Sequence, residues 1–227
     1  MLQVVFGVTS LIIITQGANV TQISDLEQAF RKSHIIPKQL TKSPNETLWI
    51  RYKSDLPIKT GQTYSTESIK GVPRVLWHCD RPPVYYTLVC IGLNEWQLYD
   101  KKPTSTPAPI PSPDLIKWLV VNIPQNDYRE GAVIHPYKHP TPVLGYDKLL
   151  YLFLVYKQDK GINAYDYRFL ENTNMKQFGP DKKQDFPHLR ELEKFYQIYN
   201  IVAANFFWYR FTKDEISDFL DPYYSSY

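Results

Sequence analysis

The side chains that could do chemistry are few, and their spacing does not bring them together. His135 and His139 are four residues apart, a spacing suited to two metal ligands on one helical face, but a proline follows each of them and prevents that helix. Cys79 follows His78 directly, and adjacent strand residues point to opposite faces, so they do not form a nucleophile–base pair. The sequence contains neither a Gly-x-Ser-x-Gly elbow nor a glycine-rich phosphate loop. We therefore expect a protein that is not an enzyme and that uses no cofactor or metal.

The composition indicates a globular protein rich in strands. The 227 residues carry 26 basic and 23 acidic side chains, and this net charge of +3 gives no reason to expect nucleic-acid binding. With 18 Tyr, 18 Pro and only 9 Gly, the chain is suited to strands joined by stiff loops. A chain of this length can bury a core without disulfides. Its two cysteines, Cys79 and Cys90, are expected to be unpaired core thiols, because a regular hairpin would hold them too far apart.

The N-terminal segment predicts entry into the secretory pathway. Residues Leu2–Ile14 are almost entirely apolar, small residues follow at 17–18, and no charged side chain occurs before Asp25. This pattern is typical of a cleaved signal peptide, predicted here over residues 1–18. The apolar run is too short for a stable membrane span of about 20 residues, although an uncleaved anchor is the alternative. We therefore expect a secreted protein.

The remaining chain, residues 19–227, is expected to form one domain with its core at about residues 30–220. No internal repeat and no linker divides it. The stretch 101–113 holds five prolines and is expected to be an exposed loop, with a polyproline recognition segment as the alternative. Two Asn-x-Thr sequons, at Asn19 and Asn45, would be glycosylated in a secreted chain.

Hydrophobic patterning predicts a mostly-β domain with a few short helices. Alternating or continuous apolar runs predict strands over residues 48–52, 72–77, 84–91, 118–122, 151–156 and 205–211. Helical spacing of apolar residues predicts helices over residues 25–32, 187–200 and 213–220.

Six short segments link this pattern to a known family. They are HIIPKQL at 34–40, YYTLV at 85–89, WLVVNIPQND at 118–127, EGAVIHPY at 130–137, YLFLVYKQ at 151–158 and ANFF at 204–207. In order and spacing these segments resemble the phosphatidylethanolamine-binding protein family. The resemblance implies a Greek-key β-sandwich with short peripheral and C-terminal helices.

The resemblance also implies where a ligand site would lie. The family's site is a small pocket for phosphate-like head groups, built from an Asp-Pro-Asp-x-Pro motif, a His, and a Gly-x-His-Arg-Tyr motif. Here the two aspartates correspond to Gly92 and Asn94, and the pocket His falls on Ile116. The His-Arg pair falls on Leu149 and the leucine after it, whereas Tyr151 is kept. The predicted remnant of the pocket consists of Gly92, Asn94, Ile116, Leu149 and Tyr151.

The exchanges remove most of the donors that a buried phosphate needs, so we predict that anionic head-group binding is lost or greatly weakened. Lys117 would restore one positive charge, but strand alternation should point it away from Ile116. Either side chains fill the site, or Ile116, Leu149 and Tyr151 line a reshaped pocket for an apolar ligand.

The expected function is therefore non-enzymatic binding by a secreted, monomeric member of this family. The expected ligand is a small apolar molecule, a lipid or a protein partner, with no nucleic acid and no stable transmembrane span. The alternative is a structural subunit, such as the mitochondrial ribosomal protein in which the same family fold occurs.

Overall fold

The computed structural model describes residues 25–44, 46–52, 55–65, 68–69, 71–80, 84–99, 116–142, 146–164 and 189–224. The predicted signal peptide, the sequons at Asn19 and Asn45, and the proline-rich stretch 101–113 lie outside the described residues. Those expectations therefore stay predictions.

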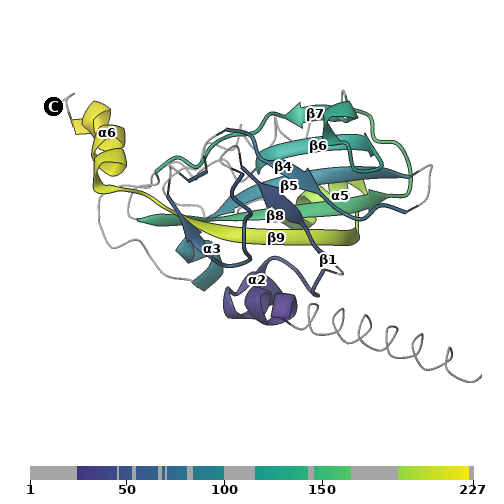
Figure 1. The fold of residues 1–227 in the computed structure, drawn as a ribbon, viewed down its shortest axis with the longest axis horizontal. Coiled ribbons are helices and arrows are strands. Elements are labelled where there is room, and N and C mark those ends of the chain that lie inside the picture. Colours follow the sequence, from purple (N-terminus) through teal and green to yellow (C-terminus); the bar gives the residue numbers. More distant parts are fainter. Residues whose placement is uncertain are drawn as a thin grey trace, which may run out of the picture.

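A seven-stranded sheet forms the centre of the fold (Figure 1). The strand order is β1-β9-β8-β5-β6-β7, and β3 also pairs with β9. The long central strands are antiparallel, whereas β1 and β3 run parallel to β9. The strands are β1 (Glu46–Thr47), β3 (Thr63–Tyr64), β5 (Tyr85–Leu93), β6 (Ile116–Pro124), β7 (Ala132–His135), β8 (Lys148–Gln158) and β9 (Asn200–Arg210).

A second, two-stranded antiparallel sheet covers one face of the central sheet. It consists of β2 (Trp49–Arg51) and β4 (Arg74–Leu76), and β4 lies in front of the central strands in Figure 1. Ile50 and Val75 are direct partners in this pair and both are buried, whereas Trp49 and Leu76 are exposed. The small sheet thus has one face toward the core and one toward solvent.

Helices lie on the other face and at the ends of the sheet. Residues 25–32 are helical, and α5 lies behind the sheet in Figure 1, while α6 extends beyond the far end of β9. No helix within the described ranges is long and apolar enough to cross a membrane. The remaining helical elements are α2 (Ile35–Lys38), α3 (Glu95–Tyr99), the 3-10 turn η1 (Tyr128–Glu130), α5 (Leu189–Tyr196) and α6 (Lys213–Tyr224).

The helix predicted over residues 187–200 is too long at its C-terminal end. It ends at Tyr196, and Gln197 has a φ of 55°, the left-handed conformation that commonly terminates helices. Asn200 already belongs to β9. Tyr199, which extends the helical spacing in the sequence, lies just before β9 and is 62% exposed, so its match to the spacing does not reflect burial.

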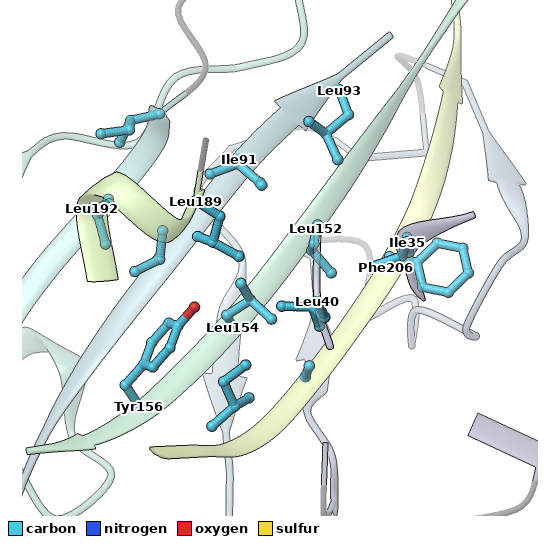
Figure 2. Close-up of a cluster of buried hydrophobic side chains, with 14 of the residues drawn as sticks. Ile35, Leu40, Ile91, Leu93, Leu152, Leu154, Tyr156, Leu189, Leu192 and Phe206 are labelled. Atoms are coloured by element: carbon cyan, nitrogen blue, oxygen red, sulfur yellow. The ribbon is translucent and has the colours of Figure 1, made fainter. Parts of the chain in front are cut away.

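The sheet separates two hydrophobic cores. Alternate residues of β8 enter one core or the other, because successive side chains of a strand point to opposite faces. The helix-side core contains Leu152 and Leu154 and is covered by α5 and α2. Figure 2 shows Leu189 and Leu192 of α5 and Ile35 of α2 in this core. The sheet-side core contains Tyr151 and Phe153 and is covered by the small sheet. Burial on both faces explains why these strands read as continuous apolar runs.

Candidate functional site

Three of the predicted pocket residues meet on the sheet-side face. Gly92 of β5 lies directly opposite Tyr151 of β8, and Leu149 is two residues before Tyr151 on the same face. A Cβ atom at Gly92 would lie 2.8 Å from Lys117 Cε and 3.5 Å from Tyr151 Cε2. The space that a larger residue would occupy at Gly92 is therefore taken by these two side chains.

Ile116 does not join this group, so the prediction that Ile116, Leu149 and Tyr151 line one pocket is wrong. Ile116 belongs to the helix-side core, whereas Leu149 and Tyr151 belong to the sheet-side core. The cause is a register shift between β5 and β6, where Cys90 pairs with Trp118 but Ile91 pairs with Ile116. A shift of this kind redirects side chains locally.

The bulge brings Lys117 into the position that Ile116 was expected to take. Lys117 and Ile116 do point apart, as strand alternation predicts, but Lys117 is the one beside Gly92 and Tyr151. The side chain is only 3% exposed. The sheet-side core therefore contains the Lys117 side chain, which was expected to point away from the site.

The residues around Tyr151 are tightly packed. Leu149 and Tyr151 have no exposed surface, and Asn94, which follows β5, is 3% exposed. Tyr151 Oη donates a hydrogen bond to the Lys138 carbonyl oxygen at 3.3 Å, and Lys138 N donates to the Lys117 carbonyl oxygen at 2.7 Å. These bonds hold the segment after β7 across the site. Of the two alternatives, the packing favours a site filled with side chains.

The hydroxyls and the thiol of the sheet-side core are in their neutral forms. Burial raises the pKa of Tyr52, Tyr137 and Tyr151, and the Tyr52 and Tyr137 hydroxyls lie 2.7 Å apart in a mutual hydrogen bond. Burial also raises the pKa of the Cys90 thiol, although Lys117 opposes this effect. A neutral buried thiol is a poor nucleophile. Both cysteines are free, with Cys90 buried and Cys79 half-buried.

The two histidines considered as metal ligands have separate surroundings. His135 Nδ1 lies 2.9 Å from the Pro136 carbonyl oxygen. His139 packs edge-on against Tyr137 with ring centroids 5.2 Å apart, and burial lowers its pKa. Within the described part of the chain, no three His, Cys, Asp or Glu side chains gather into a metal-ligand group.

A surface groove of about 710 Å³ lies beside the small sheet, and the sequence did not reveal it. Its walls come from β2, β4, and the loop and 3-10 turn after β6, so no single stretch of sequence carries a signal for it. Asn126 Nδ2 donates to the Trp77 carbonyl oxygen at 3.0 Å, and Tyr128 Oη donates to the Pro73 carbonyl oxygen at 3.3 Å, which ties the two walls together. The lining residues are Arg51, Tyr52, Asp55, Val72, Arg74, Val75, Leu76, Asn126, Asp127, Tyr128 and Arg129.

Comparison with known sequences gives two informative relatives. No protein-family model matches the sequence. The chain is 28% identical to the putative odorant-binding protein A5 of Drosophila melanogaster over 183 residues, which cover 81% of this chain and 79% of that protein. It is 25% identical to a 26 kDa secreted antigen of Toxocara canis over 135 residues, which cover 60% of this chain and 48%, or about half, of the antigen.

Comparison with solved structures gives the fold. Carboxypeptidase Y inhibitor, solved in complex with its cognate proteinase, matches with a TM-score of 0.60 and 17% identity over 84% of this chain and 97% of that chain. The phosphatidylethanolamine-binding protein of Plasmodium falciparum matches with a TM-score of 0.54 and 16% identity over 81% of this chain and 96% of that chain. The chain is therefore a protein of the phosphatidylethanolamine-binding protein fold, as its sequence motifs predict.

Proposed function

We propose that the protein is a secreted, non-enzymatic binding protein that recognises a protein partner on its outer surface, and that the family's anion pocket is closed in it. One observation carries this proposal. At the predicted pocket, Tyr151 has no exposed surface and Lys117 occupies the space above Gly92.

A phosphate-like head group could reach this site only at considerable cost. It would have to displace the Lys138 segment and break two hydrogen bonds, one from Tyr151 Oη to the Lys138 carbonyl oxygen and one from Lys138 N to the Lys117 carbonyl oxygen. Gly92 offers no side-chain donor, so the Lys117 ammonium would be the main compensation. A buried anion with too few donors loses its hydration without replacement.

Two further observations support binding outside the cell rather than catalysis. The apolar segment Leu2–Ile14 has the pattern of a signal peptide, and one relative is named as a secreted antigen. The neutral, buried Cys90 thiol and the separated histidines offer no nucleophile–base pair. Carboxypeptidase Y inhibitor, which was solved with its proteinase, supports a protein as the partner.

A second candidate is the binding of a small apolar ligand. The observation that favours it is the name of the Drosophila relative, a putative odorant-binding protein, which matches over most of both chains. Such a ligand would need an opening in the sheet-side core around Tyr151, which is packed in this structure.

Native mass spectrometry of the protein secreted from a eukaryotic host tests the proposal. We expect a mature chain that begins near residue 18 or 19 and gains no mass from phosphoethanolamine or from long-chain lipids. A saturable phosphoethanolamine adduct in the wild-type protein that is abolished in Lys117→Met would place an anion at this site and contradict the closed pocket. A co-purifying apolar molecule would favour the second candidate instead.

A further inference from the structure

We propose that the groove beside the small sheet binds an extended peptide segment of a partner protein, in which an acidic side chain and an apolar side chain are separated by one residue. This inference rests on the proposed function, because it assigns the place and the chemistry of the surface recognition proposed there.

Two arginines face each other on the outer side of the small sheet. Arg51 of β2 and Arg74 of β4 are direct partners in the antiparallel pair, an arrangement in which like charges repel. Arg51 Nη1 is 2.8 Å from Asp55 Oδ1. Among the described residues, Arg74 has no ion-pair partner within 4.0 Å. Arg51 thus has a carboxylate partner, whereas an added carboxylate would supply one for Arg74.

The Arg51 side chain also has an unused donor. Its Nε atom is buried and has no hydrogen-bond partner among the described atoms. A guanidinium presents its donors as a rigid planar fork that matches a carboxylate in two simultaneous bonds. A buried donor without an acceptor is unfavourable, which leaves the Arg51 guanidinium incompletely paired. An incoming carboxylate would contact the exposed third of the Arg51 side chain and the exposed Arg74 side chain.

An apolar pair lies next to the arginine pair on the same face. Trp49 and Leu76 are direct partners across the two strands, and they are 38% and 47% exposed. The Arg51 guanidinium carbon lies 4.6 Å from the centroid of the Trp49 ring, so the two pairs are in contact. Leu76 also lines the groove, which makes the apolar pair continuous with it.

The distance between the two pairs sets the spacing of the ligand. The arginine pair and the apolar pair are two residues apart along each strand, which corresponds to about 6.6 Å. An extended peptide has the same rise, so its side chains at i and i+2 match the two pairs. An acidic residue at i and an apolar residue at i+2 would therefore contact both pairs at once.

Other occupants fit this surface less well. The groove carries three arginines and two aspartates, whereas anionic membranes attract clusters of about four to eight basic residues. Asp127 already pairs with Arg129, whose Nε and Nη2 donate to it at 2.8 and 2.9 Å, which neutralises the far wall. A two-fold dimer through this face would bring the arginine pair against its own copy, since such interfaces are self-complementary.

Fluorescence anisotropy with labelled peptides tests the inference on the full secreted chain. The probes are a peptide containing Glu-Ser-Leu, a counterpart containing Lys-Ser-Leu, and one containing Glu-Ser-Ser. We expect binding of the first and at least about tenfold weaker binding of the other two. Arg74→Glu and Leu76→Ser, both at exposed positions, are each expected to weaken the first complex about tenfold or more.

Arg210→Glu at the end of β9 is the charge-matched control, and it is expected to leave the Kd unchanged. Equal binding of all three peptides would overturn the inference, as would an equal loss of affinity in Arg210→Glu. Binding to phosphatidylserine vesicles or self-association that depends on Arg74, with no peptide binding, would also overturn it in favour of another occupant. None of these outcomes involves phosphoethanolamine, so failure here is distinguishable from failure of the closed-pocket proposal.

Discussion

The contact between Gly92 and Lys117 gives the sharpest test of how the site is closed. In Gly92→Ala the new methyl group would lie 2.8 Å from Lys117 Cε and 3.3 Å from Lys117 Cγ, closer than non-bonded carbons normally come. Overpacking of this kind costs about 1–3 kcal/mol of unfolding free energy. Because the obstructing atoms belong to a side chain rather than to the backbone, we expect a loss near the lower end of that range, measured by urea denaturation.

The same contact predicts a coupling between the two positions. Lys117→Ala removes the atoms that the methyl group meets, so Gly92→Ala should cost less in that background, by about 1 kcal/mol. Gly161→Ala is the matched control, because a Cβ atom there would meet nothing within 4 Å, and its stability should stay at or slightly above wild type. A Gly92→Ala variant as stable as wild type, or additive effects of the two substitutions, would refute the reasoning.

Three further predictions concern a buried amide, a partly buried carboxyl group and the two cysteine thiols. Asn205→Leu should lower the unfolding free energy by about 2–3 kcal/mol, because it removes two hydrogen bonds in a buried site. Asn205 Nδ2 donates to the Leu48 carbonyl oxygen at 2.9 Å, and its Oδ1 accepts from Phe206 N at 2.8 Å. A urea midpoint equal to wild type would contradict this prediction. Burial raises the pKa of Glu193 above its ordinary value of 4.5, so its contribution to stability is present below that value and fades as pH rises through the raised pKa. Glu193→Gln should therefore flatten the decline of thermal stability as pH rises above 4.5, whereas parallel curves would show that Glu193 is not responsible. A thiol reagent should label half-buried Cys79 in the native protein and Cys90 only after unfolding, and rapid native labelling of Cys90 would contradict its burial.

The sequence predicts the fold well where burial dominates the pattern. The central strands have continuous apolar runs because both faces of the sheet are covered. Within such a run, strand alternation correctly assigns Leu152 and Tyr151 to different cores. The spacing predicts too long a helix at α5, because Tyr199 matches the helical period although the chain leaves the helix at Gln197. Tyr199 is 62% exposed, so an apolar residue at the expected spacing need not face a core.

The site was harder to predict because it depends on strand register. Alternation assigns Ile116 and Lys117 to opposite faces correctly, but only the bulge between β5 and β6 decides which of them lies beside Tyr151. A bulge depends on pairing across the sheet, which a single sequence does not reveal. The groove was missed for the same reason, since Arg51 and Arg74 are 23 positions apart and become neighbours only when β2 pairs with β4.

The closed pocket is the central claim, and an amide NMR titration with phosphoethanolamine tests it most directly. If the sheet-side core is closed, the amide signals of Gly92, Lys117 and Tyr151 should not shift at ligand concentrations up to about 1 mM, a range that would detect binding as weak as about −4 kcal/mol. Saturable shifts that centre on these three residues would show that the pocket admits an anion, and would contradict the account.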